Sequence, residues 1–264
     1  MSEIETLREE LFCTKYELDA FADFIINGKA ERWLPSFTDN VKEIDHLNRY
    51  LLTYEFVHDK KVLDIACGAG KGSYLMGTKG NAHSVLGADI SSLSIRYASH
   101  RYCAPNVSFA EIDGTRLAFN EEFDVVVSFE TIEHIATFKE FLKNAWKALK
   151  PNGTFIVSTP VSGEAFDAKP LNPFHTQEWG FDEFQRELNS ENFVIEKTFI
   201  QLDHKLKSPS LYKRVFKRAF YKKENIIHYT GYNEKRVEEY VGQYDKREFG
   251  KIRNGFQIVI CKKN

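Results

Sequence analysis

The residues best suited to chemistry lie in the decapeptide FETIEHIATF, which spans residues 129–138. Glu130, Glu133 and His134 stand at positions i, i+3 and i+4, so a helix beginning here would carry all three on one face. Two carboxylates and an imidazole on one face form half of a metal site. Acidic residues also favour the first turn of an ordinary helix for electrostatic reasons, so both interpretations stay open at this point.

A second candidate, His175, lies in the segment NPFHTQEWGFDEF, which spans residues 172–184. The segment follows a predicted strand that ends near Pro160. Because ligands of parallel sheets bind just beyond the strand ends, we expect His175 near the same rim as Glu130. Without a metal, His134 or His175 is the candidate general base, the group that takes a proton from a nucleophile.

An alternation of strands and helices would position these residues. Amphipathic spacing predicts helices over residues 3–27 and 40–57. After them, predicted strands and helices alternate regularly. Near-continuous Val, Ile and Leu runs between helices predict a parallel sheet covered on both faces. The predicted strands cover residues 61–67, 84–90, 107–113, 123–129, 153–159, 193–201 and 255–262, with helices over 70–77, 91–102 and 138–150, the last closed by Pro151, Asn152 and Gly153.

The first predicted strand runs into the glycine-rich turn VLDIACGAGKG, residues 62–72. Gly68, Gly70 and Gly72 allow a tight turn and a close approach of the backbone to a ligand, while the next helix presents its N-terminus. A dinucleotide-binding pattern would require Gly or Ala at its sixth position, where this chain has Ser73. The turn alone therefore indicates a nucleotide-like ligand without naming it.

The same segment resembles motif I of the class I S-adenosylmethionine (SAM)-dependent methyltransferases, and the resemblance extends over residues 44–200 and the last strand. It implies an α/β, Rossmann-like, seven-stranded and mostly parallel sheet with helices on both faces. Asp89 would then accept hydrogen bonds from both ribose hydroxyls, Asp113 would contact adenine, and Arg49 would pair with the methionine carboxylate. The implied cofactor-binding residues are Arg49, Asp64, Ala66, Gly68, Gly70, Asp89, Ile90, Asp113, Gly114 and Glu130.

The resemblance also implies a division of the chain. Residues 1–57 would form an N-terminal helical segment that covers the active site, and residues 58–264 the SAM-binding domain. Residues 202–250 interrupt the strand rhythm as an insertion or lid, and they carry eight Lys or Arg and no acid between residues 205 and 223. A locally basic insertion of this kind would suit a phosphate-bearing acceptor.

The pattern E-x-x-E-H followed by a downstream histidine is similar to the small-RNA 3′-terminal 2′-O-methyltransferases and, less closely, to the ubiquinone-pathway O-methyltransferases. By that resemblance Glu130, Glu133, His134 and His175 would hold a divalent Mn, Mg, Fe, Co or Zn ion. The small-RNA enzymes have a further histidine near the downstream one, which this chain lacks. The catalytic residues implied with or without metal are His134, His175 and Glu133.

The segments ERWLPSF and HLNRYLL resemble bacterial methyltransferases encoded with glycosyltransferases for capsule and other surface glycans. That resemblance implies an O-methyltransferase acting on a small sugar-related, phosphorylated or nucleotide-linked acceptor. Two alternatives stay open: an RNA ribose 2′-O-methyltransferase, and a non-catalytic subunit that binds SAM or a nucleotide. The intact Asp89, Glu130, Glu133 and His134 argue against a decayed site.

The composition of the chain limits the partners and the cellular location that we expect. The 36 basic and 38 acidic side chains nearly cancel, so we expect neither a nucleic-acid partner nor general attraction to a membrane. The four cysteines form no C-x-x-C pair, as in proteins of a reducing cytosol. Since no stretch approaches the roughly 18 apolar residues of a membrane span, a soluble, cytoplasmic protein is predicted.

Overall fold

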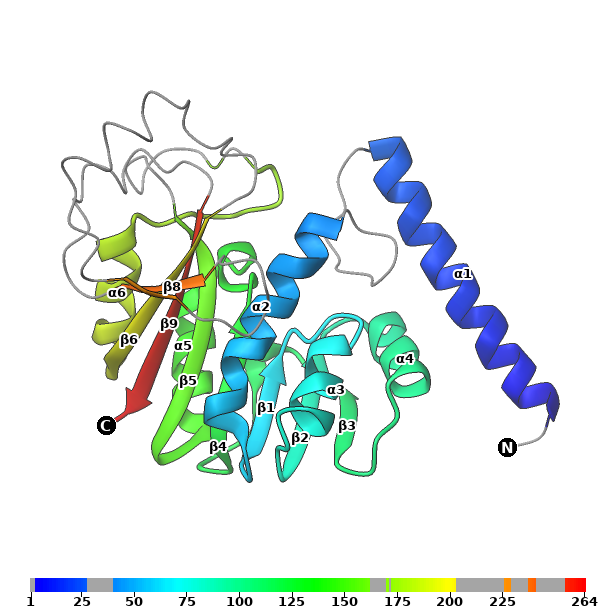
Figure 1. Cartoon of the computed structure of the whole chain (residues 1–264), viewed down its shortest axis with the longest axis horizontal. Helices are drawn as coiled ribbons and strands as arrows, with labels where there is room; N and C mark the ends of the chain where they lie inside the picture. Colours follow the sequence, from blue (N-terminus) through cyan, green and yellow to red (C-terminus); the bar gives the residue numbers. More distant parts are fainter. Residues whose placement is uncertain are drawn as a thin grey trace.

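The computed structural model describes residues 3–27, 40–161, 170, 172–202, 226–228, 237–240 and 255–264. Within them one sheet has nine strands in the order β3-β2-β1-β4-β5-β9-β6-β8-β7 (Figure 1). Strands β1 to β5 are parallel, and β9 runs antiparallel between β5 and β6. The strands are β1 (Lys61–Ile65), β2 (Ser84–Asp89), β3 (Val107–Glu111), β4 (Phe123–Phe129), β5 (Leu149–Val161), β6 (Phe193–Leu202), β7 (Ile226–His228), β8 (Val237–Tyr240) and β9 (Gly255–Lys263).

The seven strands from β3 to β6 confirm the predicted seven-stranded, mostly parallel sheet. The sequence did not predict β7 and β8, which lie within the insertion and extend the sheet beyond β6. The basic run at residues 205–223 lies outside the described residues. No helix in the described ranges is long and apolar enough to span a bilayer.

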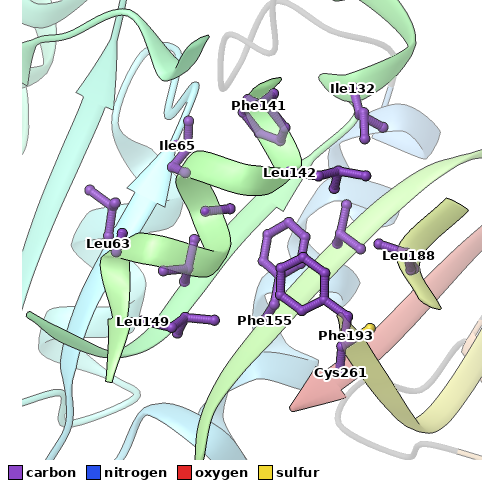
Figure 2. Close-up of a cluster of buried hydrophobic side chains, with 14 of the residues drawn as sticks. Leu63, Ile65, Ile132, Phe141, Leu142, Leu149, Phe155, Leu188, Phe193 and Cys261 are labelled. Atoms are coloured by element: carbon purple, nitrogen blue, oxygen red, sulfur yellow. The ribbon is translucent and has the colours of Figure 1, made fainter. Parts of the chain in front are cut away.

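Helices cover both faces of the sheet, as predicted. One face packs against α5 and α6 through a cluster that includes Leu63, Phe141 and Leu188 (Figure 2). The opposite face packs against α2 and α3 through Leu52, Val62 and Met76. The helices are α1 (Glu3–Asn27), α2 (Asn40–Val57), α3 (Lys71–Thr78), α4 (Ser92–Arg101), α5 (Phe138–Ala148) and α6 (Phe181–Ser190).

Side-chain alternation explains why the strands read as apolar runs. In β4, Val125 and Val127 enter the α2/α3 cluster, whereas Val126 enters the α5/α6 cluster. Because consecutive residues of a strand point to opposite faces and both faces are buried, the three central positions of β4 are all apolar. The first polar residue after such a run is therefore placed at the rim of the sheet.

Two local predictions were wrong. No helix begins at Glu130: this residue follows β4 in a left-handed conformation with φ of 52°, and only a 3-10 turn, η2 (Ile132–His134), comes before α5. The decapeptide lacks a helix-capping residue ahead of Glu130, where Phe129 still belongs to β4. In addition, Pro151 to Gly153 do not close a helix, since α5 ends at Ala148 and these residues form an irregularity within β5.

Candidate active site

A cavity of about 570 Å³ opens at the carboxyl ends of the parallel strands. This is the position at which ligands of such sheets bind. Among the described residues, Arg49, Asp64, Glu133 and His175 lie outside its lining. The predicted site residues that do line it are Ala66, Gly68, Gly70, Asp89, Ile90, Asp113, Gly114, Glu130 and His134.

The loop after β1 turns through left-handed backbone conformations. Gly68 and Gly70 have φ angles of 56° and 84°. A Cβ atom on Gly68 would meet no heavy atom within 4 Å, so the backbone there borders open space. A Cβ atom on Gly70 would lie 2.5 Å from the Cβ of Ala98 in α4. Gly68 is therefore accessible to a ligand, whereas Gly70 is required for helix packing.

Asp89, the last residue of β2, holds this loop in place. Its Oδ2 accepts a hydrogen bond of 2.9 Å from the backbone N–H of Gly68, and its Oδ1 accepts one of 2.9 Å from Ser91. A carboxylate offers about four acceptor positions, so Asp89 retains capacity for ribose hydroxyls. Its neighbour Ile90 is 70% exposed and offers an apolar surface beside it. The open backbone at Gly68 and this carboxylate fit the ribose and methionine parts of SAM.

Asp113 follows β3 and begins the 3-10 turn η1 (Gly114–Arg116). Its Oδ1 accepts hydrogen bonds from the hydroxyl and the backbone N–H of Thr115, at 2.7 and 2.8 Å. These bonds, with a contribution from Arg116, lower the pKa of Asp113, so the group is an ionised acceptor at neutral pH. Such an acceptor on the cavity wall fits the amino group of an adenine ring.

Asp64 supports the glycine-rich loop and does not face the cavity. It is buried beneath the glycine-rich loop, where its Oδ2 accepts a hydrogen bond of 2.6 Å from the Ser73 hydroxyl. The Tyr50 hydroxyl lies 3.5 Å from both carboxylate oxygens. Burial raises the pKa of Asp64 to about 7, against the lowering effect of these hydrogen bonds. Asp64 therefore positions the loop and does not contact the cavity.

Tyr50 is a cavity residue that the sequence reasoning missed. Together with His46 and Arg49 it forms a polar face of α2 at spacings of three and four residues, a signal that could have revealed it. Burial raises the pKa of Tyr50 well above its usual value, and the Asp64 charge adds to this effect. The Tyr50 ring lies against Gly72, which explains the third glycine of the turn.

We expect Gly72→Ala to destabilise the protein by about 1–3 kcal/mol through overpacking. The new Cβ atom would lie 1.9 Å from Cζ of Tyr50, so the ring would have to move. Chemical denaturation measures the change in free energy of unfolding. The double variant with Tyr50→Ala is the control: its cost should be smaller than the sum of the single costs, and strict additivity would contradict the proposed contact.

Arg49 of α2 supports Glu130, which lines the cavity at the strand ends. Arg49 is 2% exposed, its Nη1 lies 3.7 Å from Oε1 of Glu130, and its Nε donates a 2.7 Å hydrogen bond to Gln201. Its guanidinium stacks over the ring of Phe256 at 4.5 Å. Glu130 also accepts a 2.7 Å hydrogen bond from the Ser158 hydroxyl. Glu130 faces the cavity, and Arg49 supports it from behind.

Glu133 is 1% exposed and points to the other face of the sheet. The hydroxyl of Thr159 donates a 3.1 Å hydrogen bond to its Oε2. Burial raises the pKa of Glu133 well above its usual value, and the nearby Glu130 charge raises it further. Ser158 and Thr159 are consecutive strand residues with opposite side-chain directions. They therefore hold Glu130 and Glu133 on opposite sides.

His134 and His175 meet edge to face, with ring centroids 4.8 Å apart. Nδ1 of His134 donates to the carbonyl oxygen of Phe174 at 3.0 Å, and Nδ1 of His175 lies 2.6 Å from Oε1 of Glu178. Since a carbonyl oxygen and a carboxylate oxygen accept hydrogen bonds, Nδ1 of each imidazole is placed as a donor. Nε2 of His175 lies 2.9 Å from the side-chain nitrogen of Asn172. Glu178 is a second residue that the sequence reasoning missed.

The structure gathers three of the four predicted metal ligands. One potential ligand atom each from Glu133, His134 and His175 lie within 4.8 Å of one another. Glu130 stands outside this group, because its carboxylate is directed to Ser158 and Arg49. Bonds of 2.0–2.2 Å to an ion require ligand atoms to be roughly 3–4 Å apart, so the three groups would close by about 1 Å around a cation. The acceptors on both Nδ1 atoms are typical of histidines that bind metals.

These features define the class of the protein. A sheet with its last strand antiparallel between the fifth and sixth core strands, a glycine-rich loop after β1 and an acid after β2 form the class I SAM-dependent methyltransferase fold. A family described as a methyltransferase domain matches residues 57–223, more than half of the chain. The chain belongs to this family.

Known relatives agree with this assignment. A probable SAM-dependent methyltransferase of Mycolicibacterium smegmatis is 31% identical over 141 residues, covering 53% of this chain and 54% of the relative. The phthiotriol/phenolphthiotriol dimycocerosates methyltransferase 1 of Mycobacterium ulcerans is 32% identical over 159 residues, covering 56% and 55%. The chain thus spans about half the length of the curated relatives it matches.

A solved structure shows the same fold with the cofactor bound. The phosphoethanolamine N-methyltransferase 2 of Haemonchus contortus, in complex with SAM, aligns with a TM-score of 0.55 at 16% identity. The alignment covers 82% of this chain and 52% of that one. At this identity the likeness concerns the fold.

Proposed function

We propose that the protein transfers a methyl group from SAM to an oxygen of a small hydroxylated acceptor, assisted by a divalent cation. The observation that carries this proposal is the group of Glu133, His134 and His175 beside the cofactor cavity. When bound, SAM supplies a methyl group on a good leaving group, so the protein must position an oxygen and manage its proton. The cluster offers groups suited to both tasks.

Cofactor binding and acceptor activation would be divided between the two ends of the cavity. Asp89 and Gly68 would hold the ribose end, and Asp113 the adenine edge. His134 and Glu130 also line the cavity. Phe129, Ile135 and Phe141 also line the cavity and would exclude water from the reacting groups. The acceptor oxygen would therefore approach from the side of His134.

Glu133, His134 and His175 would hold the cation. A divalent ion at this place would supply Lewis acidity that lowers the pKa of an acceptor hydroxyl. Mixed nitrogen and oxygen ligands suit Mn, Fe, Co or Zn better than Mg. The buried Glu133 carboxyl would release its proton to accept the ion, and Glu178 would hold the His175 ring in orientation.

In the absence of a cation the same geometry would favour His134 over His175 as general base. His134 lines the cavity, and its Nδ1 is held by a carbonyl oxygen, which orients the ring. Nε2 of His175 instead lies beside Asn172. The two mechanisms differ in their need for metal and for the Glu133 carboxylate.

The acceptor we propose is sugar-related and phosphorylated or nucleotide-linked, as in bacterial surface-glycan synthesis. The resemblance to glycan-associated methyltransferases and the basic run at residues 205–223 support this class. The relatives name other acceptors, a phthiotriol dimycocerosate and phosphoethanolamine, of which the second carries a phosphate. Screening sugar nucleotides, sugar phosphates, lipid alcohols and 3′-terminal RNA with labelled SAM tests the proposal.

Metal removal should lower methyl transfer at least about tenfold, a typical loss when an activating group is removed. Dialysis against EDTA, followed by readdition of Mn, Fe, Co or Zn, measures the effect. SAM affinity should change less than turnover, because Gly68, Asp89 and Asp113, the predicted ribose and adenine contacts, do not belong to the group of Glu133, His134 and His175. Full activity after exhaustive chelation would contradict the proposed metal site, and His134 would then be the candidate general base. Binding of SAM without turnover on any acceptor would instead support a non-catalytic subunit.

A further inference from the structure

The N-terminal helix α1 has two opposite faces, and only one of them contacts the rest of the described protein. Figure 1 shows α1 at the edge of the molecule beside α4. On its inner face Cys13 and Tyr16 are buried. On its outer face four large apolar side chains are between 56 and 71% exposed: Ile4, Leu7, Leu11 and Leu18. An exposed apolar row of this size on one helix calls for a partner.

The inner face fixes the orientation of α1. Arg96 of α4 makes a two-pronged ion pair with Glu9, with distances of 2.8 and 3.0 Å. The Tyr16 ring stacks on Tyr97 at 4.7 Å, and the Tyr97 hydroxyl donates a 2.8 Å hydrogen bond to Glu17. Because α1 is held by polar and aromatic contacts together, its apolar row is kept facing outward.

The spacing of the outer row identifies the kind of partner. When the position of Thr14 is counted, the row recurs at alternating spacings of three and four residues. This is the heptad pattern of helices that supercoil around each other. Thr14 occupies one seam position, and its hydroxyl donates to the carbonyl oxygen of Glu10 within α1. Over the side chains that the structure describes, the row is Ile4, Leu7, Leu11, Thr14 and Leu18, two heptads long. Such a row fits another helix better than a flat surface.

The charges beside the row identify the partner as a second copy of this chain. One flank carries only glutamates, Glu3, Glu10 and Glu17, and the other carries Arg8, Lys15 and Ala22. In a parallel helix pair each residue of the first flank meets the residue of the second flank five positions later in the partner. Glu3 would meet the partner's Arg8, and the partner's Lys15 would join Glu10, which already pairs with His100 and Arg101 of α4. In an antiparallel pair glutamates would face glutamates.

We propose that α1 pairs with α1 of a second copy as a parallel two-stranded coiled coil, which makes the protein a homodimer. The seam lies roughly opposite the face that binds α4, so both copies can keep their own α1–α4 contacts. A lipid surface is a poorer occupant: α1 has seven acidic and two basic residues, and anionic lipids repel such a helix.

Light scattering of the full chain tests the proposal. A monomer has a mass of 30.6 kDa, and we expect twice this mass at concentrations of about 100 μM. The double variant Leu7→Lys, Leu11→Lys should be a monomer with unchanged circular dichroism, since both positions are exposed. Val194→Lys, at an exposed apolar residue of β6, is the matched control and should remain dimeric. A monomeric wild type, or a dimer that the seam variant leaves intact, would overturn the proposal.

Two further variants test the parallel orientation. Arg8→Glu with Lys15→Glu should weaken the dimer at least about tenfold, since glutamates would then line both flanks. Leu7→Cys in a Cys103→Ser background should form an interchain disulfide on mild oxidation, because a parallel seam places identical residues opposite each other. The other three cysteines are buried. A dimer that forms no such disulfide and tolerates the charge reversal would contradict the parallel seam.

Discussion

Replacing Asp89 by alanine should weaken SAM binding at least about 100-fold. Hydrogen bonds to a charged group contribute about 1.5–3 kcal/mol each, and two ribose hydroxyls would lose this acceptor. The variant also removes the bonds that fix the backbone of Gly68 and Ser91. Calorimetric titration with SAM and with its demethylated product measures the loss, and both ligands should be affected equally because the ribose is common to them.

Glu111→Ala is the matched control. Glu111 ends β3 directly beside Asp89 in the sheet, carries the same charge and does not line the cavity. Its replacement should leave SAM affinity within about twofold of the wild type, as for a surface substitution. If the Asp89 variant bound SAM as tightly as the Glu111 variant, the assignment of the ribose to Asp89 would have to be abandoned.

The second large effect is expected from Glu133→Gln. Glutamine keeps the shape and the hydrogen bond with Thr159 but cannot become an anion. With a cation in the cluster, the variant should lose metal and at least about 100-fold in kcat while SAM affinity stays constant. Without a cation, burial and the Glu130 charge favour the neutral carboxyl, so the replacement by glutamine should change kcat little. The same substitution thus separates the two mechanisms.

The pH dependence of metal binding provides an independent readout. Since burial raises the pKa of Glu133, a metal ion must displace its proton, and metal affinity should increase with pH until that pKa is passed. In the Glu133→Gln variant this dependence should be reduced. Glu187→Gln, at an exposed ion pair with Lys139, controls for the loss of one negative charge and should retain metal, pH dependence and turnover.

The sheet could be predicted because its strands are buried on both faces and read as apolar runs. For the same reason the polar residues that end them, such as Asp89 and Glu130, identified the rim. The prediction of a helix at Glu130 was wrong, since the local spacing of residues does not show that Glu130 adopts a left-handed backbone conformation. That one conformation separates Glu130 from Glu133 and removes it from the predicted metal group.

Side-chain contacts between residues far apart in the chain could not be predicted from the sequence. Arg49 was predicted from the resemblance to SAM-dependent methyltransferases, but its contacts with Gln201 and Phe256 join residues more than 150 positions apart. The pairing of His175 with Glu178 is local, yet the choice of that acid over others depends on the fold of the loop. Such contacts follow from tertiary packing and leave no periodic signal in the sequence.

The position of Arg49 limits where the protein can be shortened. A chain beginning after residue 57 would keep every glycine and acid of the cofactor motif, and it would contain all but the first residue of the region that matches the methyltransferase family. It would nevertheless lack one side of the cavity, because Glu130 and Gln201 would lose Arg49 and the loop would lose Tyr50. The smallest piece that can be expressed with an intact cavity therefore begins before Asn40, where α2 starts.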